Sequence, residues 1–159
     1  MKSTNQYLKI IYLIQRDKKE ATTLTIAAKL AIKPASVTEM LKKLAEEKYV
    51  TYTPYHGAKL TEKGSSMAKK IMRKHLLLEA FLKNILKLSD EEVCKQAQAM
   101  EDSLSDHADQ QLCIFLNRPL EGPIDKKSIP HCTKKISCED CLSASGEKMR
   151  KDAIILSRV

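Results

Sequence analysis

The sequence predicts a mainly α-helical protein with one small β-hairpin. Only 4 glycines and 5 prolines occur in 159 residues, and apolar side chains recur at helical spacing through most of residues 3–117. β-branched and aromatic residues gather in residues 49–61, where Gly57 supplies a turn between two short strands. Prolines, glycines and cysteines replace the helical pattern after residue 117. We therefore expect three parts, residues 1–64, 65–117 and 118–159.

Two helices are expected before the first proline. The first follows a capping residue, Ser3 or Thr4, and has a broad apolar side. The second covers residues 24–30 and ends before a tight turn. Its buried face is expected to consist of Leu24, Ala27, Ala28 and Ala31.

A third helix is expected to start at Pro34, whose fixed φ and missing N–H suit the first helical position. Its inward positions are Val37, Met40, Leu41 and Leu44. Two helices across a tight turn, followed by a hairpin, are typical of a winged helix-turn-helix domain. The outward face then offers short polar side chains for base edges and cations for phosphates. The candidate DNA-binding residues are Lys33, Ala35, Ser36, Thr38, Glu39, Lys42 and Lys43 on or beside this helix, and His56 and Lys59 in the hairpin.

Composition narrows the class of protein. Lys and Arg outnumber Asp and Glu by 28 to 20, which favours a polyanionic partner, although a basic face that is merely solvated would have the same composition. No apolar run approaches the roughly 20 residues of a membrane span, and the N-terminus lacks a signal peptide, so we expect a cytoplasmic protein. No glycine-rich phosphate loop, nucleophile elbow or His-Asp-Ser set is present, and we expect no enzyme.

Three further helices are expected after the hairpin. Nothing between Ser66 and Leu86 breaks a helix, so a long helix leads away from the first part. Ser89 and Glu92 form a capping box, and the helix that it opens is expected to run at least to Leu104. Another helix, capped by Ser105, stops before Pro119. Residues 89–117 carry enough apolar surface to predict a homodimer.

These expected helices carry several side chains that could bind a metal ion. His75 and Glu79 are four residues apart and share one face. Cys94, Gln98, Glu101 and Asp102 fall on one face of the next helix if that helix continues through them. Together these groups would suit Fe²⁺, Mn²⁺, Co²⁺ or Zn²⁺. The other interpretation is an exposed His75–Glu79 pair and a buried, inert Cys94.

A second group of cysteines lies near the C-terminus. Cys132, Cys138 and Cys141 are closely spaced, and Cys113 precedes them in the last expected helix. In a reducing compartment such thiols favour a structural Zn²⁺ or an iron–sulfur cluster over disulfides. The other interpretation is a tail with incidental thiols.

Several segments together resemble the diphtheria-toxin-repressor/manganese-regulator (DtxR/MntR) family. They are residues 7–12 (YLKIIY), 27–44 with its Pro-Ala-Ser-Val-Thr turn, 60–64 (LTEKG) and 73–79 (RKHLLLE). The resemblance covers residues 3–117 and implies a metal-dependent transcriptional repressor. It further implies a winged-helix N-terminal domain, a helical dimerisation domain and divalent-metal sites at their junction, as in the two-domain members without an SH3-like domain.

Matched by position to this family, His75, Glu79 and Glu101 correspond to metal ligands. With Cys94, where some members have histidine, His75 and Glu79 would form the ancillary-type site. The regulatory-type site would contain Gln6, Gln98, Glu101 and Asp102 and lacks the family's strongest donors. Lys9 stands where manganese members have a glutamate ligand.

The predicted function is a homodimeric transcriptional repressor that binds a palindromic DNA operator and responds to Fe²⁺, Mn²⁺ or Zn²⁺. Two alternatives stay open from the sequence. One is an iron–sulfur or redox-responsive regulator that uses the cysteine group. The other is a metal-carrying module that docks a protein partner.

Overall fold

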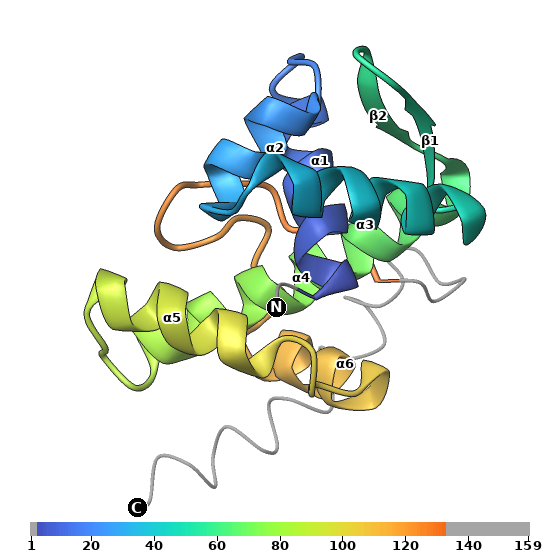
Figure 1. Cartoon of the computed structure of the whole chain (residues 1–159). Coiled ribbons are helices and arrows are strands. Elements are labelled where there is room, and N and C mark those ends of the chain that lie inside the picture. The colour runs from blue at the N-terminus through green and yellow to red at the C-terminus, as the bar shows by residue number, and fades with distance from the viewer. Residues whose placement is uncertain (1–2, 133–159) are drawn as a thin grey trace, which may run out of the picture.

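The computed structural model describes residues 3–132, which form six α-helices and one two-stranded antiparallel sheet (Figure 1). In chain order the elements are α1 (Thr4–Arg16), α2 (Thr23–Leu30), α3 (Pro34–Glu46), β1 (Val50–Thr53), β2 (Gly57–Leu60), α4 (Glu62–Asn84), α5 (Asp90–Met100) and α6 (Asp106–Phe115). Figure 1 shows α1–α3 and the hairpin at one end and α5 and α6 at the other, with α4 joining them. The predicted mainly α fold with a winged helix-turn-helix is confirmed. None of the helices among residues 3–132 is long and apolar enough to cross a bilayer.

Local sequence determines where the helices begin. Ser3 and Gln6 form a capping box at α1, and Ser89 and Glu92 form the one predicted at α5. Lys33, the residue before α3, makes no side-chain cap, and Pro34 takes a position where its missing N–H costs nothing.

The winged domain has one apolar core. Fully buried side chains from α1, α2 and α3 pack together there, among them Leu8, Ile26 and Leu41. The buried face predicted for α2 is wrong in part: Leu24 is 69% exposed, and Ala28 and Ala31 are exposed too. Ile26, Ala27 and Leu30 are buried instead. Burying the large side chains of Ile26 and Leu30, four residues apart, removes more apolar area from water than burying Ala28 and Ala31 would.

α4 links the two ends of the molecule without interruption. Thr61 caps it, so the helix starts at Glu62, before the boundary expected at residue 64. Gly64 lies under the start of the hairpin, where an added Cβ would stand 1.9 Å from the Tyr49 carbonyl oxygen. This position therefore requires glycine for close packing of α4 against the wing.

The second core lies between α4, α5 and α6. Leu78 and Leu82 of α4 pack against Val93 and Ala97 of α5. The segment after α6 returns to α4, where Ile129 packs on Leu76 and its neighbours. α5 ends at Met100, whereas the sequence predicted a helix to Leu104. Cys138 and Cys141 lie outside the described residues.

Candidate DNA interface and metal site

The outer face of α3 is available to a partner. Val37, Leu41 and Leu44 are buried, and Met40 is half-buried. Thr38 is half-buried, and its hydroxyl donates to the Pro34 carbonyl oxygen at 3.2 Å. The exposed residues of this surface are Lys33, Ala35, Ser36, Glu39, Lys42 and Lys43. The helix thus presents the mixed small, polar and cationic face that the sequence indicated.

A groove continues this face toward the hairpin. His56 and Lys59 are exposed as expected, and Tyr55 at the hairpin tip is fully exposed. The residues that line the groove are Thr22, Thr23, Leu24, Thr38, Lys42, Tyr52, Pro54 and Tyr55. Sequence reasoning missed the contribution of α2, and the exposed Leu24 explains why: its position in the apolar pattern suggested burial.

A cluster of polar side chains lies where α4 leaves the winged domain. His75 Nε2 is 3.1 Å from Glu79 Oε1, and Cys94 Sγ of α5 is 3.8 Å from the same oxygen. On the other side of the ring, His75 Nδ1 is 2.6 Å from Glu101 Oε2. Lys9 Nζ of α1 donates to both Glu101 oxygens, at 2.6 and 2.8 Å. Three elements of the chain therefore meet around one imidazole ring.

The other three predicted ligands, Gln6, Gln98 and Asp102, make their contacts elsewhere or face solvent. Gln6 Oε1 accepts from the Ser3 backbone N–H at 3.1 Å, as part of the capping box of α1. Gln98 is exposed on α5. Asp102 is exposed beyond the end of α5 and accepts hydrogen bonds from Asn5 at 2.7 Å and Ser3 at 3.4 Å. The expectation that Asp102 shares a helical face with Cys94 is wrong because the helix stops at Met100.

Burial and charge perturb the groups of the cluster. Burial alone would lower the pKa of His75, but its contacts with Glu101 and Glu79 outweigh this, and the pKa is raised. Cys94 is an exposed residue, but partial desolvation of its thiol, followed by the Glu79 charge, raises the pKa of that thiol. Glu79 Oε2 is buried and has no hydrogen-bond partner in the described part of the chain.

The side chains of His75, Glu79 and Cys94 have donor atoms that suit a divalent metal, but their present positions do not form a complete metal site. Within residues 3–132, no three His, Cys, Asp or Glu side chains form a ready ligand set. Donors of a tetrahedral ion lie about 3.3 Å apart for N and O and about 3.5 Å apart for S and O, from bond lengths of about 2.0 and 2.3 Å. The 3.1 and 3.8 Å separations at Glu79 bracket these values. The unpartnered Oε2 adds a free donor, so His75, Glu79 and Cys94 offer suitable donor atoms, and their side chains would have to move to hold an ion.

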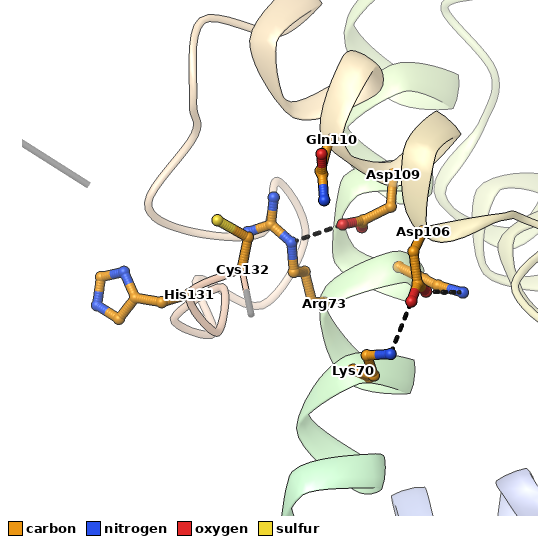
Figure 2. A pocket seen from close by; sticks show the side chains of 8 residues that line it. Lys70, Arg73, Asp106, Asp109, Gln110, His131 and Cys132 are labelled. Atoms are coloured by element: carbon orange, nitrogen blue, oxygen red, sulfur yellow. Dashed lines mark hydrogen bonds and ion pairs between the residues drawn. The ribbon is translucent and has the colours of Figure 1, made fainter. Parts of the chain in front are cut away.

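A buried ion pair connects α4 with α6 on another side of the helix (Figure 2). Arg73 Nε donates to Asp109 Oδ2 at 2.9 Å, and Arg73 Nη1 donates to the Pro130 carbonyl at 3.0 Å. Although burial lowers it, the pKa of Arg73 is raised by hydrogen bonds to Asp109 and Cys113. Cys132 lines the same small cavity as Arg73. Two of the four predicted cysteine ligands thus lie around one guanidinium.

The fold and the cluster define a class: a winged-helix DNA-binding regulator with metal-type side chains between its DNA-binding and helical domains. Residues 1–58 match the N-terminal DNA binding domain of iron dependent repressors, and residues 61–130 match their metal binding and dimerisation domain. The chain therefore belongs to this family of metal-dependent transcriptional repressors, whose members are regulators and not enzymes. The family resemblance is confirmed, and so is the inference of a metal-dependent transcriptional regulator.

Individual relatives agree with this assignment. The chain is 41% identical over 117 residues to the uncharacterized HTH-type transcriptional regulator MJ0568 of Methanocaldococcus jannaschii, covering 73% of this chain and 94% of that protein. It is 32% identical over 133 residues to the HTH-type transcriptional regulator MntR of Bacillus subtilis, covering 84% and 93%. The solved structure of the manganese regulator SloR superposes with a TM-score of 0.75 at 34% identity. That comparison covers 84% of this chain and 62% of the SloR chain.

Proposed function

We propose that this chain is a homodimeric, cytoplasmic repressor that binds a palindromic operator when a divalent ion occupies His75, Glu79 and Cys94. The observation that carries the proposal is the position of this cluster, on the helix that joins the winged domain to the helical domain. The ion would supply a positive centre that draws the three donors of α4 and α5 together. Fixing this junction would hold the two recognition helices of a dimer one DNA turn apart.

The identity of the ion follows from the donors and from the relatives. One imidazole, one carboxylate and one thiol suit Fe²⁺, Mn²⁺ or Zn²⁺. A related manganese-dependent repressor has been solved with manganese, and the related ScaR with Zn²⁺. We propose Fe²⁺ or Mn²⁺ as the physiological ion, with Zn²⁺ as a competent substitute.

The test is DNA binding by one sample before and after metal removal. Protein purified without oxygen is treated with a chelator, and its affinity for operator duplex is followed by fluorescence anisotropy as Mn²⁺ or Fe²⁺ is returned. We expect tighter binding with metal and a steep loss of affinity as salt rises. If the DNA affinity is the same with and without metal, the proposed metal response is refuted. If the DNA affinity does not depend on salt, a protein-docking module is favoured.

The recognition surface leads to a prediction about α3. Lys42→Ala and Lys43→Ala should each weaken binding to all duplexes alike and reduce the salt slope by about one, because each removes one phosphate contact. Ser36→Ala should instead relax the preference for the operator over random DNA. Titrations at several salt concentrations measure both effects. Lys95→Ala, an exposed lysine on α5, is the matched control and should change neither. If both lysine variants kept the affinity and the salt slope of the unaltered chain, α3 would not be the helix that binds in the DNA groove.

A second candidate function is an iron–sulfur or redox response through the cysteine group. It is favoured by the approach of Cys113 and Cys132, which are far apart in sequence, to the same arginine side chain. With Cys138 and Cys141 they would supply four thiolates for a cluster or a structural Zn²⁺.

The cysteine group should hold its metal independently of the junction. Replacing Cys132, Cys138 and Cys141 together by serine should remove one Zn²⁺ or one iron–sulfur chromophore per chain, because thiolates are its ligands. The measurement is elemental analysis with sulfide assay and visible absorbance. Cys94→Ser is the control and should leave that centre in place. Full metal content in the triple variant would mean that these thiols bind nothing.

A further inference from the structure

Lys9 is a buried cation at the junction of the two domains. It is 8% exposed and is the only lysine among residues 3–132 with so little exposure. Its ammonium donates to both oxygens of Glu101, which is 2% exposed. Lysine is almost never buried in this way unless a partner compensates its charge.

The two nitrogens of His75 face two different carboxylates. Nε2 faces Glu79 Oε1, which the thiol of Cys94 also contacts, and the buried Glu79 Oε2 has no partner in the described residues. Nδ1 faces Glu101 Oε2 at 2.6 Å. One side of the ring therefore has unused donor capacity for an ion, and the other side is already occupied.

Both carboxylate oxygens of Glu101 are already engaged by side chains of this chain. Lys9 engages Oε1 at 2.6 Å, and both Lys9 and His75 engage Oε2, at 2.8 and 2.6 Å. Histidines that bind a metal through one nitrogen usually donate the N–H of the other nitrogen to a carboxylate, which fixes the ring and its tautomer. Glu101 has the position of that carboxylate, and the ammonium of Lys9 balances its charge.

We infer that Lys9 is a built-in cation that takes the place of a second metal ion, and that Glu101 orients His75 and is not itself a ligand. The inference rests on the proposed metal site at His75, Glu79 and Cys94. The junction then holds one divalent ion, on the Nε2 side of His75. The ion is connected to α1 of the winged domain through His75, Glu101 and Lys9.

This arrangement gives the ion a route to the DNA-binding domain. Bound at Nε2, an ion would polarise the ring, and His75 would then be a stronger Nδ1–H donor to Glu101. The carboxylate is at the same time held by a side chain of α1, which packs against α4. Tightening of one hydrogen bond therefore acts across the boundary between the two domains.

The number of Mn²⁺ ions per chain tests the inference, measured by equilibrium dialysis and elemental analysis on the full chain and its variants. Glu101→Gln should keep the same number of ions but bind the junction ion about 10- to 100-fold more weakly, the usual effect of losing an outer-shell partner. Glu79→Gln should lose one ion. Lys9→Glu should gain one ion, because the new carboxylate and the released Glu101 both require a cation. Lys9→Arg keeps the cation and should match the unaltered chain.

A double variant keeps the test decisive if a single variant fails to fold. Lys9→Met/Glu101→Gln removes both buried charges together and should still bind the same number of ions as the unaltered chain. Loss of one ion in this variant or in Glu101→Gln would show that Glu101 is a ligand and would overturn the inference. An unchanged ion count in Lys9→Glu would show that Lys9 does not stand in a cation site, and would overturn it as well.

A second measurement separates this inference from the proposed function. The spectrum of bound Co²⁺ reports thiolate ligation directly, and it is measured with Cys132, Cys138 and Cys141 replaced by serine so that Cys94 is the thiol under test. It should be unchanged when Glu101→Gln is added and should lose its sulfur-to-metal band when Cys94→Ser is added. Neither the ion count nor this spectrum involves DNA. If metal leaves the DNA affinity of the unaltered chain unchanged, the proposed function fails while the ion counts still decide the role of Lys9.

Discussion

Replacing Phe115 by glutamate should turn a dimer into a monomer and lower the affinity for a palindromic operator by at least about a hundredfold. Phe115 is 48% exposed and lies edge-on to Phe81, with the ring centroids 6.4 Å apart. Both rings belong to one apolar groove, whose lining residues are Leu78, Phe81, Met100, Leu104, Ala108, Gln111, Leu112 and Phe115. A groove of this kind on α4 and α6 fits a second copy of the same surface.

The size of this effect comes from the linkage of two half-sites. In a dimer, binding of one recognition helix places the other at an effective concentration near millimolar, and a monomer loses that gain. A carboxylate in the interface would be buried without a partner, which opposes association. Light scattering at tens of micromolar gives the oligomeric state, and anisotropy compares a full palindrome with a half-site.

A matched substitution controls for added charge. Leu120→Glu introduces the same side chain at a position that is 73% exposed and outside the groove. It should leave the dimer and its operator affinity intact. A Phe115→Glu protein that stays dimeric, or a Leu120→Glu protein that dissociates equally, would place the dimer interface elsewhere.

The His75→Ala/Glu79→Ala double variant should lose the response of DNA affinity to metal. If metal tightens binding by the 5- to 150-fold that is typical of coupled sites, the variant should show a change of less than about twofold. The reason is that the variant removes two of the three proposed ligands, His75 and Glu79, and leaves only Cys94. Operator titrations with and without Mn²⁺ measure the difference.

Asp102→Ala is the informative control for this experiment. The spacing in the sequence made Asp102 a candidate ligand, but the structure pairs it with Asn5 and Ser3. Its removal should leave most of the metal response in place. A loss as large as that of the double variant would mean that Asp102 moves to the ion when metal binds. The double variant should also retain any metal held by the C-terminal cysteines.

Local patterns predicted most of the fold and half of the site. Capping boxes, Pro34 and the apolar spacing of α3 act within a few residues, so they can be interpreted without a structure. His75 and Glu79 were predictable as a pair because i,i+4 spacing in a helix brings them together whatever packs around them.

The remainder depends on contacts between distant parts of the chain. α5 ends early where Glu101 is drawn to Lys9 and Asp102 to Asn5, and both partners come from α1. These contacts cannot be predicted from the sequence of residues 94–104 alone. The sequence predicted Glu101 and Asp102 on one helical face. In the structure Glu101 is buried beside His75, and Asp102 is on the surface.

The unbroken course of α4 has a mechanical consequence for the operator. With 23 residues the helix is about 34 Å long, at about 1.5 Å per residue. His75 lies 13 residues, about 20 Å, from the start of the helix, so a rotation of about 10° at His75 would move that start by about 3.4 Å, one base-pair step. The helix acts as a lever arm, so an angular change too small to disturb either core suffices to carry a recognition helix out of register with its half-site.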